Sequence, residues 1–99
     1  MHYSATKGAV IAFTKALALE YATTGVTANT ITPFAVDTPA LRAAQEARFI
    51  PPTEYLTRAI PMGRLGTVDE IASMCAYLCS DAAGYVTGQV MSPNGGAVT

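Results

Sequence analysis

Apolar residues recur at every third or fourth position in the first part of the chain, which is the spacing of one face of an α-helix. This stripe, which we expect to face the core, consists of Val10, Phe13, Leu17 and Tyr21. A second stripe on the same predicted helix is made of small residues: Ala5, Ala9, Ala12 and Ala16. Small side chains let another helix approach closely, although alanine is also simply the best helix former. Gly25 suits a left-handed cap, so the pattern predicts a helix from about residue 3 to residue 24.

A strand and a short helix are predicted next. Residues 26–32 are rich in β-branched side chains, and Pro33 ends the run. Thr38 and Pro39 then form a helix start, with Thr as N-cap and Pro at the first helical position. This helix is expected to reach about Arg48.

Two further helices are predicted from their start and stop signals. Thr53 is expected to cap a short helix that ends before Pro61. Thr67 and Glu70 have the spacing of a capping box, which opens a helix that ends near Ser80. The apolar residues on one face of this last helix are Ile71, Met74, Cys75 and Leu78.

The order of elements is therefore helix, strand, two short helices, helix and strand, with the last strand at residues 89–92. Helices alternating with strands indicate an α/β class with parallel pairing. Two strands alone do not form a stable parallel sheet, because such sheets need both faces and their neighbouring strands covered. We therefore expect the strand at 26–32 to have partners outside these 99 residues.

Composition narrows the classes of function. Hydrophobic residues make up 51% of the chain and charged residues 13%, about half the usual charged share. So few charges cannot coat a small domain, and we expect much of the chain to be covered by something else. The net charge of −1 leaves no basic patch and argues against nucleic-acid binding. Apolar runs are short and interrupted, so no membrane-spanning segment is expected, and no signal-peptide pattern is visible.

The two cysteines indicate a compartment rather than a site. Cys75 and Cys79 lie four residues apart on a predicted helix, which is neither a redox nor a zinc spacing, and His2 is the only histidine. We expect core thiols in a reducing compartment, which predicts a cytoplasmic protein. No metal site is predicted.

Candidate chemistry lies at the start of the first helix. Tyr3 and Lys7 are four residues apart, so they project from the same face. A phenol has an unperturbed pKa of about 10, and a nearby ammonium or a helix N-terminus favours its ionised form. Such a pair can serve as a tuned proton donor and acceptor. The same spacing also occurs in ordinary surface contacts.

Longer stretches around these residues are informative. Residues 3–10 contain a Tyr-x-x-x-Lys motif, and residues 33–39, Pro-Phe-Ala-Val-Asp-Thr-Pro, are close to a Pro-Gly-x-x-x-Thr loop. Five segments in the same order resemble the C-terminal portion of the short-chain dehydrogenase/reductase family. They are residues 3–10, 18–22 with 25–31, 33–39, 64–72 and 85–90.

The resemblance implies a fold and an activity. Residues 1–99 would form the C-terminal part of a Rossmann-like, doubly wound parallel sheet. The activity would be that of an NAD(P)-dependent oxidoreductase that interconverts a small alcohol and a ketone or aldehyde by hydride transfer, with NAD or NADP as cofactor. Tyr3 would be the general acid/base, and Lys7 its electrostatic partner and a ligand of a ribose hydroxyl. The cofactor would also be contacted by Pro33, Val36 and Thr38.

The resemblance further implies a homo-oligomer that pairs through the helix at 3–24, and a variable segment at 39–61 that closes over substrate. Two residues depart from the family pattern. Phe34 stands where glycine is usual, which removes conformational freedom and could narrow the site. Asn94 stands where Asp commonly precedes the glycine pair, which removes a charge but keeps an acceptor.

The Gly-rich turn that cradles pyrophosphate in dinucleotide folds does not occur in these 99 residues. We therefore expect the chain alone, without an N-terminal dinucleotide-binding half, to be inactive. The alternative is a non-catalytic truncated fragment that acts only as an oligomerisation or split-protein partner. Substrate identity and the choice between NAD and NADP stay open, because they depend on the variable segment and on residues outside this chain.

Overall fold

The computed structural model of the chain describes residues 2–97. These residues divide into two compact units. Residues 2–31 and 75–91 form what we call the helix–strand unit, and residues 32–74 and 92–97 form the loop unit. Each unit is described by itself.

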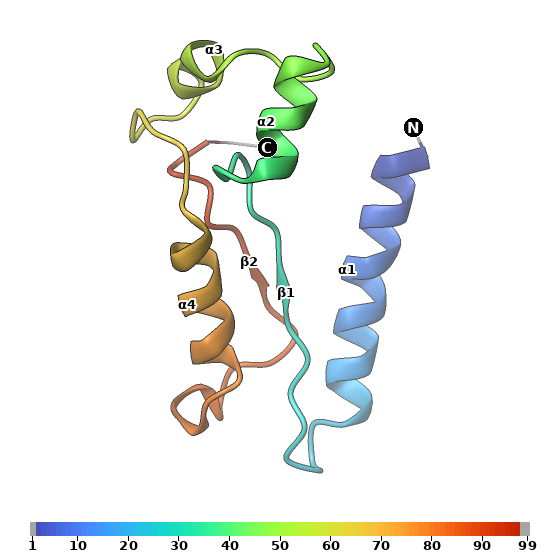
Figure 1. The fold of residues 1–99 in the computed structure, drawn as a ribbon. Coiled ribbons are helices and arrows are strands. Elements are labelled where there is room, and N and C mark those ends of the chain that lie inside the picture. The colour runs from blue at the N-terminus through green and yellow to red at the C-terminus, as the bar shows by residue number, and fades with distance from the viewer. Residues whose placement is uncertain (1, 98–99) are drawn as a thin grey trace. The chain divides into compact units, whose positions relative to one another are not determined.

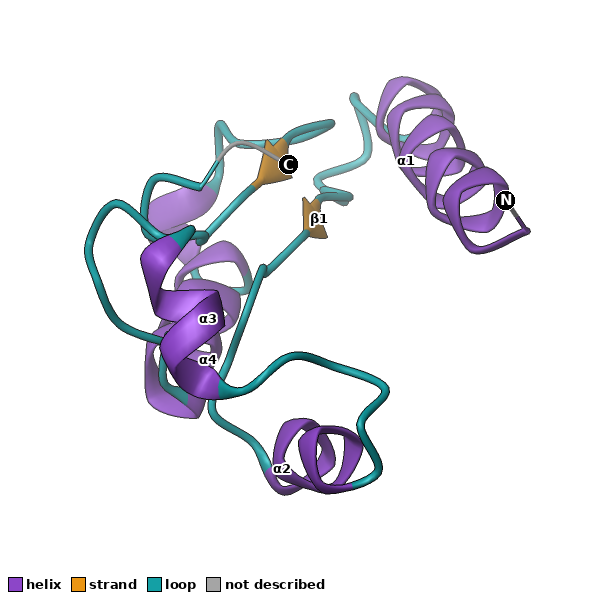
Figure 2. Cartoon of the chain, turned by 90° about the horizontal axis from the view of Figure 1, so that it is seen from above, coloured by secondary structure: helices purple, strands orange, loops and turns teal. Residues whose placement is uncertain are grey.

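In the helix–strand unit, helix α1 (His2–Glu20) packs against the first of two parallel strands (Figure 1). The strands are β1 (Thr30–Ile31) and β2 (Val90–Met91), with Thr30 opposite Val90 and Ile31 opposite Met91. Figure 2 shows α1 beside β1 from the perpendicular direction. The predicted α/β class with parallel pairing is therefore confirmed. Gly25 has the predicted left-handed conformation, with φ 84°, but α1 ends at Glu20, four residues before the predicted end, and residues 21–25 form turns.

Both strands are shorter than the runs predicted at 26–32 and 89–92. The residues just before them are joined by a mixture of backbone and side-chain hydrogen bonds, since the Gly88 N–H also donates to the Ala28 carbonyl at 2.7 Å. The Ala28 N–H donates to Thr87 Oγ1 at 3.1 Å, and Asn29 Oδ1 accepts from the Gln89 N–H at 3.0 Å. Side-chain partners of this kind satisfy the backbone but do not extend a strand.

The face of α1 that meets β1 differs from the predicted core stripe. Thr14 and Ala18 are the buried residues of the helix, whereas Val10 and Phe13 remain 46% and 66% exposed. Tyr21, just after the helix, is 41% exposed, so the predicted stripe is wrong for this structure. Apolar periodicity missed the true contact face because the residue at its centre is Thr14, whose hydroxyl is hydrogen-bonded inside the contact.

The loop unit contains helices α2 (Pro39–Glu46) and α3 (Thr53–Arg58) and the start of α4 (Val68–Leu78), which continues into the helix–strand unit (Figure 1). Thr38 caps α2 as predicted, with its Oγ1 accepting from the Leu41 N–H at 3.0 Å. The 3₁₀-helix η1 (Asp81–Ala83) follows α4 within the helix–strand unit.

Thr53 does not cap α3, contrary to the prediction. It is the first helical residue, and the N-cap is Pro52, which makes no side-chain capping bond. The Thr53 hydroxyl instead accepts from the side chain of Gln45 at 3.2 Å. The same Gln45 amide also donates to the Pro51 carbonyl at 3.1 Å, so this side chain joins α2 to the start of α3.

Apolar burial is thin in the part of the chain that the structure describes. The buried apolar residues there are Ala18, Ile60, Ala83 and Ala97. On α4, Ile71, Met74 and Leu78 are half-buried as the predicted face requires. Cys75 and Cys79 are exposed free thiols, so they are not core residues of this structure, because no described side chains cover their side of the helix. Within residues 2–97, no helix has both the length and the apolar character needed to cross a membrane.

Candidate active site

Tyr3 and Lys7 lie on the first two turns of α1, and the structure brings them together. The Lys7 Nζ lies over the Tyr3 ring, 5.3 Å from its centroid. A cation in this position is attracted by the negative face of the ring. Tyr3 is 74% exposed, so its phenol can be reached by a molecule outside the chain. The pair thus offers a phenol and an ammonium side by side on an open helix face.

Two bonds tie the middle of α1 to the rest of the helix–strand unit. The Thr30 Oγ1 on β1 donates to Thr14 Oγ1 at 2.7 Å, and Thr14 Oγ1 in turn donates to the Val10 carbonyl at 2.8 Å. The Lys15 Nζ donates to the Gly88 carbonyl at 2.9 Å. Sequence reasoning missed these contacts. The available signal was the three- and four-residue spacing that runs through Tyr3, Lys7, Ile11, Thr14 and Ala18.

The other predicted site residues lie in the loop unit. Residues 35–37 pair with Gly66, since the Gly66 N–H donates to the Ala35 carbonyl and the Asp37 N–H donates to the Gly66 carbonyl, both at 2.9 Å. Val36 forms a parallel bridge with the same glycine. These backbone bonds fix the path of the loop between Pro33 and Thr38.

An ion pair adds a further tie to this loop. Arg42 on α2 donates from Nε and Nη2 to the two carboxylate oxygens of Asp37, each at 3.0 Å. Hydrogen bonding to Asp37, together with its charge, raises the pKa of Arg42. The side chains are 64% and 45% exposed, so the pair contributes little to stability. Its planar, two-bond geometry fixes the first turn of α2 against the loop.

Thr38 combines a structural bond with a spare donor. Its hydroxyl oxygen accepts the Leu41 N–H, and Pro39 occupies the first helical position. A hydroxyl carries one proton as well as two acceptor sites. Among the described residues the Thr38 hydroxyl acts only as an acceptor, so its proton is available at the N-terminus of α2. Anionic oxygens are favoured at such a position.

Phe34 does not strain the loop. Among the described non-glycine residues, Arg48 alone has a positive φ, at 64°, so the Phe34 backbone lies in a region that any residue adopts. The ring is 38% exposed, on a loop whose backbone is pinned by Gly66. The presence of Phe34 where glycine is usual therefore causes no backbone strain, because the backbone there is not in the left-handed conformation.

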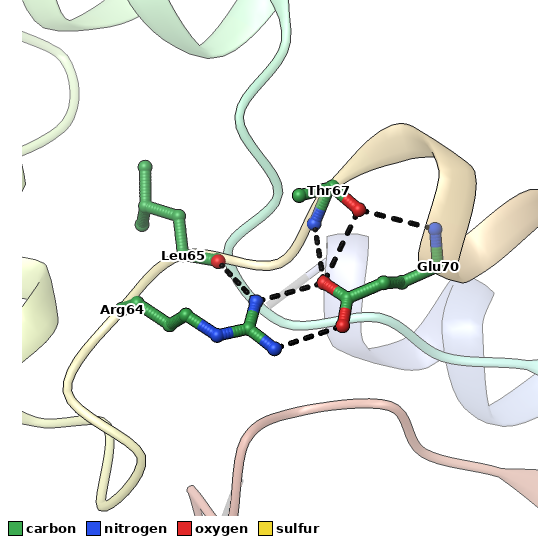
Figure 3. Close-up of polar contacts among 4 residues, drawn as sticks. All are labelled: Arg64, Leu65, Thr67 and Glu70. Carbon is green, nitrogen blue, oxygen red and sulfur yellow. Dashed lines mark hydrogen bonds and ion pairs between the residues drawn. The ribbon is translucent and has the colours of Figure 1, made fainter.

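A polar network opens α4 in the loop unit (Figure 3). Arg64 donates from Nη1 and Nη2 to the two carboxylate oxygens of Glu70, each at 2.8 Å. The Thr67 N–H donates to Glu70 Oε1 at 2.9 Å, and the Glu70 N–H donates to Thr67 Oγ1 at 3.2 Å, which confirms the predicted capping box. Hydrogen bonding from Arg64, and then from the Thr67 backbone, lowers the pKa of Glu70 to about 2.

The glycine pair near the C-terminal end packs on the segment before this network. A Cβ on Gly95 would lie 2.6 Å from Ile60 Cγ2, and the residue has φ 62°, so only glycine fits there. Asn94 Oδ1 accepts the Gly96 N–H at 3.0 Å, so the acceptor kept by the change from Asp is in use.

The structure therefore groups the five predicted site residues into two sets. Tyr3 and Lys7 meet on α1 in the helix–strand unit, whereas Pro33, Val36 and Thr38 lie along one pinned loop of the loop unit. Within residues 2–97, no three His, Cys, Asp or Glu side chains gather in a way that could hold a metal ion.

Comparison with known proteins identifies the family to which this arrangement belongs. Residues 1–98 match the family described as enoyl-(acyl carrier protein) reductase. The chain belongs to the short-chain dehydrogenase/reductase family. It is 47% identical to nodulation protein G of Azospirillum brasilense over 95 residues, which are 96% of this chain and 37% of that protein. It is 45% identical to the acetoacetyl-CoA reductase of Shinella zoogloeoides, again over 96% of this chain and 38% of the relative.

Solved structures agree with this assignment. A short-chain dehydrogenase/reductase from Brucella melitensis superposes with a TM-score of 0.85 and 38% identity, covering 99% of this chain and 38% of that one. The structure of ElxO with NADP bound gives a TM-score of 0.83 and 31% identity, over 95% of this chain and 38% of ElxO. The predicted fold, the C-terminal part of a Rossmann-like sheet, is thus confirmed. The chain spans a little over a third of the length of these relatives.

Proposed function

We propose that this chain provides the proton-transfer residues of an NAD(P)-dependent oxidoreductase that interconverts an alcohol and a ketone or aldehyde. The observation that carries the proposal is the Lys7 ammonium over the ring of the exposed Tyr3 phenol, 5.3 Å from its centroid. Tyr3 is the general acid/base. Its Oη takes the proton of the substrate hydroxyl in oxidation and returns a proton to the carbonyl oxygen in reduction.

The residues of each unit, taken separately, suit one part of a dinucleotide. Thr38 has an unused hydroxyl proton at a helix N-terminus, which suits a pyrophosphate or amide oxygen, and Pro33 and Val36 give the loop an apolar edge. Lys7 donates to a ribose hydroxyl. When bound, the dinucleotide supplies or accepts the hydride. NADPH is the cofactor to test first, because ElxO binds NADP.

The rest of the site and of the sheet is proposed to come from residues outside these 99. A hollow of about 600 Å³ beside β1 in the helix–strand unit is lined by Asn29, Ile31, Cys75, Leu78 and Cys79 among others. Further parallel strands and their helices would cover this hollow and the exposed thiols on α4. Such coverage would make the cysteines buried thiols of a reduced, cytoplasmic enzyme. We also propose that α1 pairs with the same helix of a second copy through its four exposed alanines.

The proposal is tested by Tyr3→Phe in what we call the active protein, which is this chain together with an N-terminal dinucleotide-binding half. This change keeps the ring and removes the proton, so turnover should fall by roughly a hundred- to ten-thousandfold. Tyr21→Phe is the matched control, since Tyr21 is an exposed tyrosine just after the other end of α1, and it should leave turnover unchanged. The proposal fails if Tyr3→Phe turns over NADPH as fast as the unmodified protein.

A further inference from the structure

We propose that Thr14 and Thr30 are positioning residues, whose hydroxyl contact sets the rotation of α1 about its axis and thereby aims Tyr3 and Lys7. The inference rests on the proposed function, because it assigns these hydroxyls a role in the reaction of Tyr3. Neither residue touches the reacting atoms.

The hydrogen bond between the Thr14 and Thr30 hydroxyls has a defined donor and a defined acceptor. Thr14 is 8% exposed, and its single hydroxyl proton goes to the Val10 carbonyl one turn earlier, at 2.8 Å. Its oxygen must therefore accept from the second hydroxyl, and Thr30 Oγ1 donates to it at 2.7 Å. The result is a short chain of bonds that runs from β1 to Thr14 and on to the backbone of α1.

The same helix face carries the proposed catalytic pair. Tyr3, Lys7 and Thr14 are separated by four and then seven residues, and the face continues through Ile11 and Ala18. With 3.6 residues per turn, Thr14 lies about three turns after Tyr3 and almost directly in line with it. Any rotation of α1 that displaces Thr14 from Thr30 therefore swings Tyr3 and Lys7 through the same angle.

The apolar part of this contact is too weak to fix the rotation. The buried apolar partner on this face is Ala18, whose methyl group tolerates sliding, and Ile11 is only half-buried. A hydrogen bond is directional, so it specifies one angular setting where a small methyl contact does not. Because about 1 Å of misplacement can cost roughly a hundredfold in rate, a modest rotation would be felt at the phenol.

The test is Thr14→Val in the active protein, which keeps the shape and removes the hydroxyl. We expect kcat to fall by about ten- to a hundredfold, with the KM for NADPH nearly unchanged. Thr14→Ser restores the hydroxyl and should recover most of kcat. Thr24→Val is the control: the Thr24 hydroxyl donates to the Tyr21 carbonyl at 2.7 Å and accepts from the Val26 N–H at 3.4 Å, and neither partner is in a strand, so its removal should leave kcat as it was.

Thr30→Val removes the other hydroxyl of the same contact, at a half-buried residue. It replaces Thr14→Val in the test if that variant does not fold. The double variant Thr14→Val/Thr30→Val should be no slower than either single variant, because one contact can be lost only once. Multiplied losses in the double variant, or a Thr14→Ser variant as slow as Thr14→Val, would overturn the inference. These results are read alongside Tyr3→Phe. An inactive Tyr3→Phe with an undiminished Thr14→Val overturns this inference alone, whereas an active Tyr3→Phe overturns the proposed function.

Discussion

The Thr38 hydroxyl accepts the Leu41 N–H and keeps its own proton to donate, so one side chain at the start of α2 can serve both the fold and a ligand. Loss of an N-cap of this kind costs about 1 kcal/mol. Its pattern, Thr followed by Pro, was readable from the sequence because capping is local chemistry. The neighbouring Asp37–Arg42 pair was not predicted, since a five-residue spacing carries no helical signal before the loop geometry is known.

Thr38→Ala separates the two roles of this hydroxyl. We expect a lower melting temperature from the lost cap and, in the active protein, weaker NADPH binding from the lost donor. Thr38→Ser keeps both groups and should retain both properties. Binding measured by fluorescence titration decides the matter. If Thr38→Ala lowers the melting temperature and leaves NADPH affinity intact, Thr38 has the structural role alone.

Glu70 leads to a prediction of how the free energy of unfolding depends on pH. Its pKa is lowered from 4.5 to about 2 by Arg64 and the Thr67 backbone, so the folded state favours the carboxylate. A carboxyl with a depressed folded-state pKa stabilises the fold above its unfolded pKa, and this contribution is lost as pH falls toward 2. The stability gap between the protein and Glu70→Gln should therefore be full above pH 4.5 and close toward pH 2. Denaturant melts across this range measure the gap, and a gap that does not change with pH would show that the network does not hold the carboxylate.

At the level of elements, α1 shows which features of a helix can be predicted from the spacing of its residues and which cannot. Its start and the left-handed Gly25 followed from local signals, and Tyr3 and Lys7 met as their spacing required, whereas the helix ends at Glu20 rather than near residue 24. Its contact face did not follow, because Thr14 supplies a satisfied hydroxyl where the pattern sought a large apolar side chain. Val10, Phe13 and Tyr21 of the predicted apolar stripe and the whole alanine stripe remain exposed among the described residues, whereas Leu17 is half-buried.

The uncovered alanines lead to a prediction at this scale. If α1 packs on the same helix of a second copy, Ala12→Glu places a charge in a close seam and should dissociate the oligomer. Ala22→Glu is a matched control, because Ala22 is also exposed but lies beyond the helix and outside the stripe. Light scattering gives the mass of each variant. An Ala12→Glu variant with the mass of the unmodified protein would exclude this face as the interface.

At the level of the whole molecule, the two-stranded parallel sheet and the small number of buried apolar residues are related, since a parallel sheet needs neighbouring strands and helices to cover it. Element order and the α/β class were predictable, because helix and strand signals alternate along the chain. Strand lengths were not, because the side chains of Asn29 and Thr87 take some of the backbone hydrogen bonds just before β1 and β2. How the loop of residues 33–38 is pinned to Gly66 also needed the structure, since this pairing joins residues about thirty positions apart without a sequence signal.

The most direct test of the central claim, that this chain holds the proton-transfer part of a dinucleotide-dependent site, is NADPH oxidation by two forms of the chain. One is the 99-residue chain alone. The other is a fusion in which this chain follows the residues of the Shinella zoogloeoides acetoacetyl-CoA reductase that come before its matched segment. Without a phosphate-binding turn the nicotinamide is not held in place, and the positioning that lowers the barrier by several kcal/mol is forfeited. We expect no turnover of acetoacetyl-CoA by the chain alone, and turnover by the joined form that is lost in Tyr3→Phe. Turnover by the chain alone, or by joined Tyr3→Phe at the unmodified rate, would contradict the central claim.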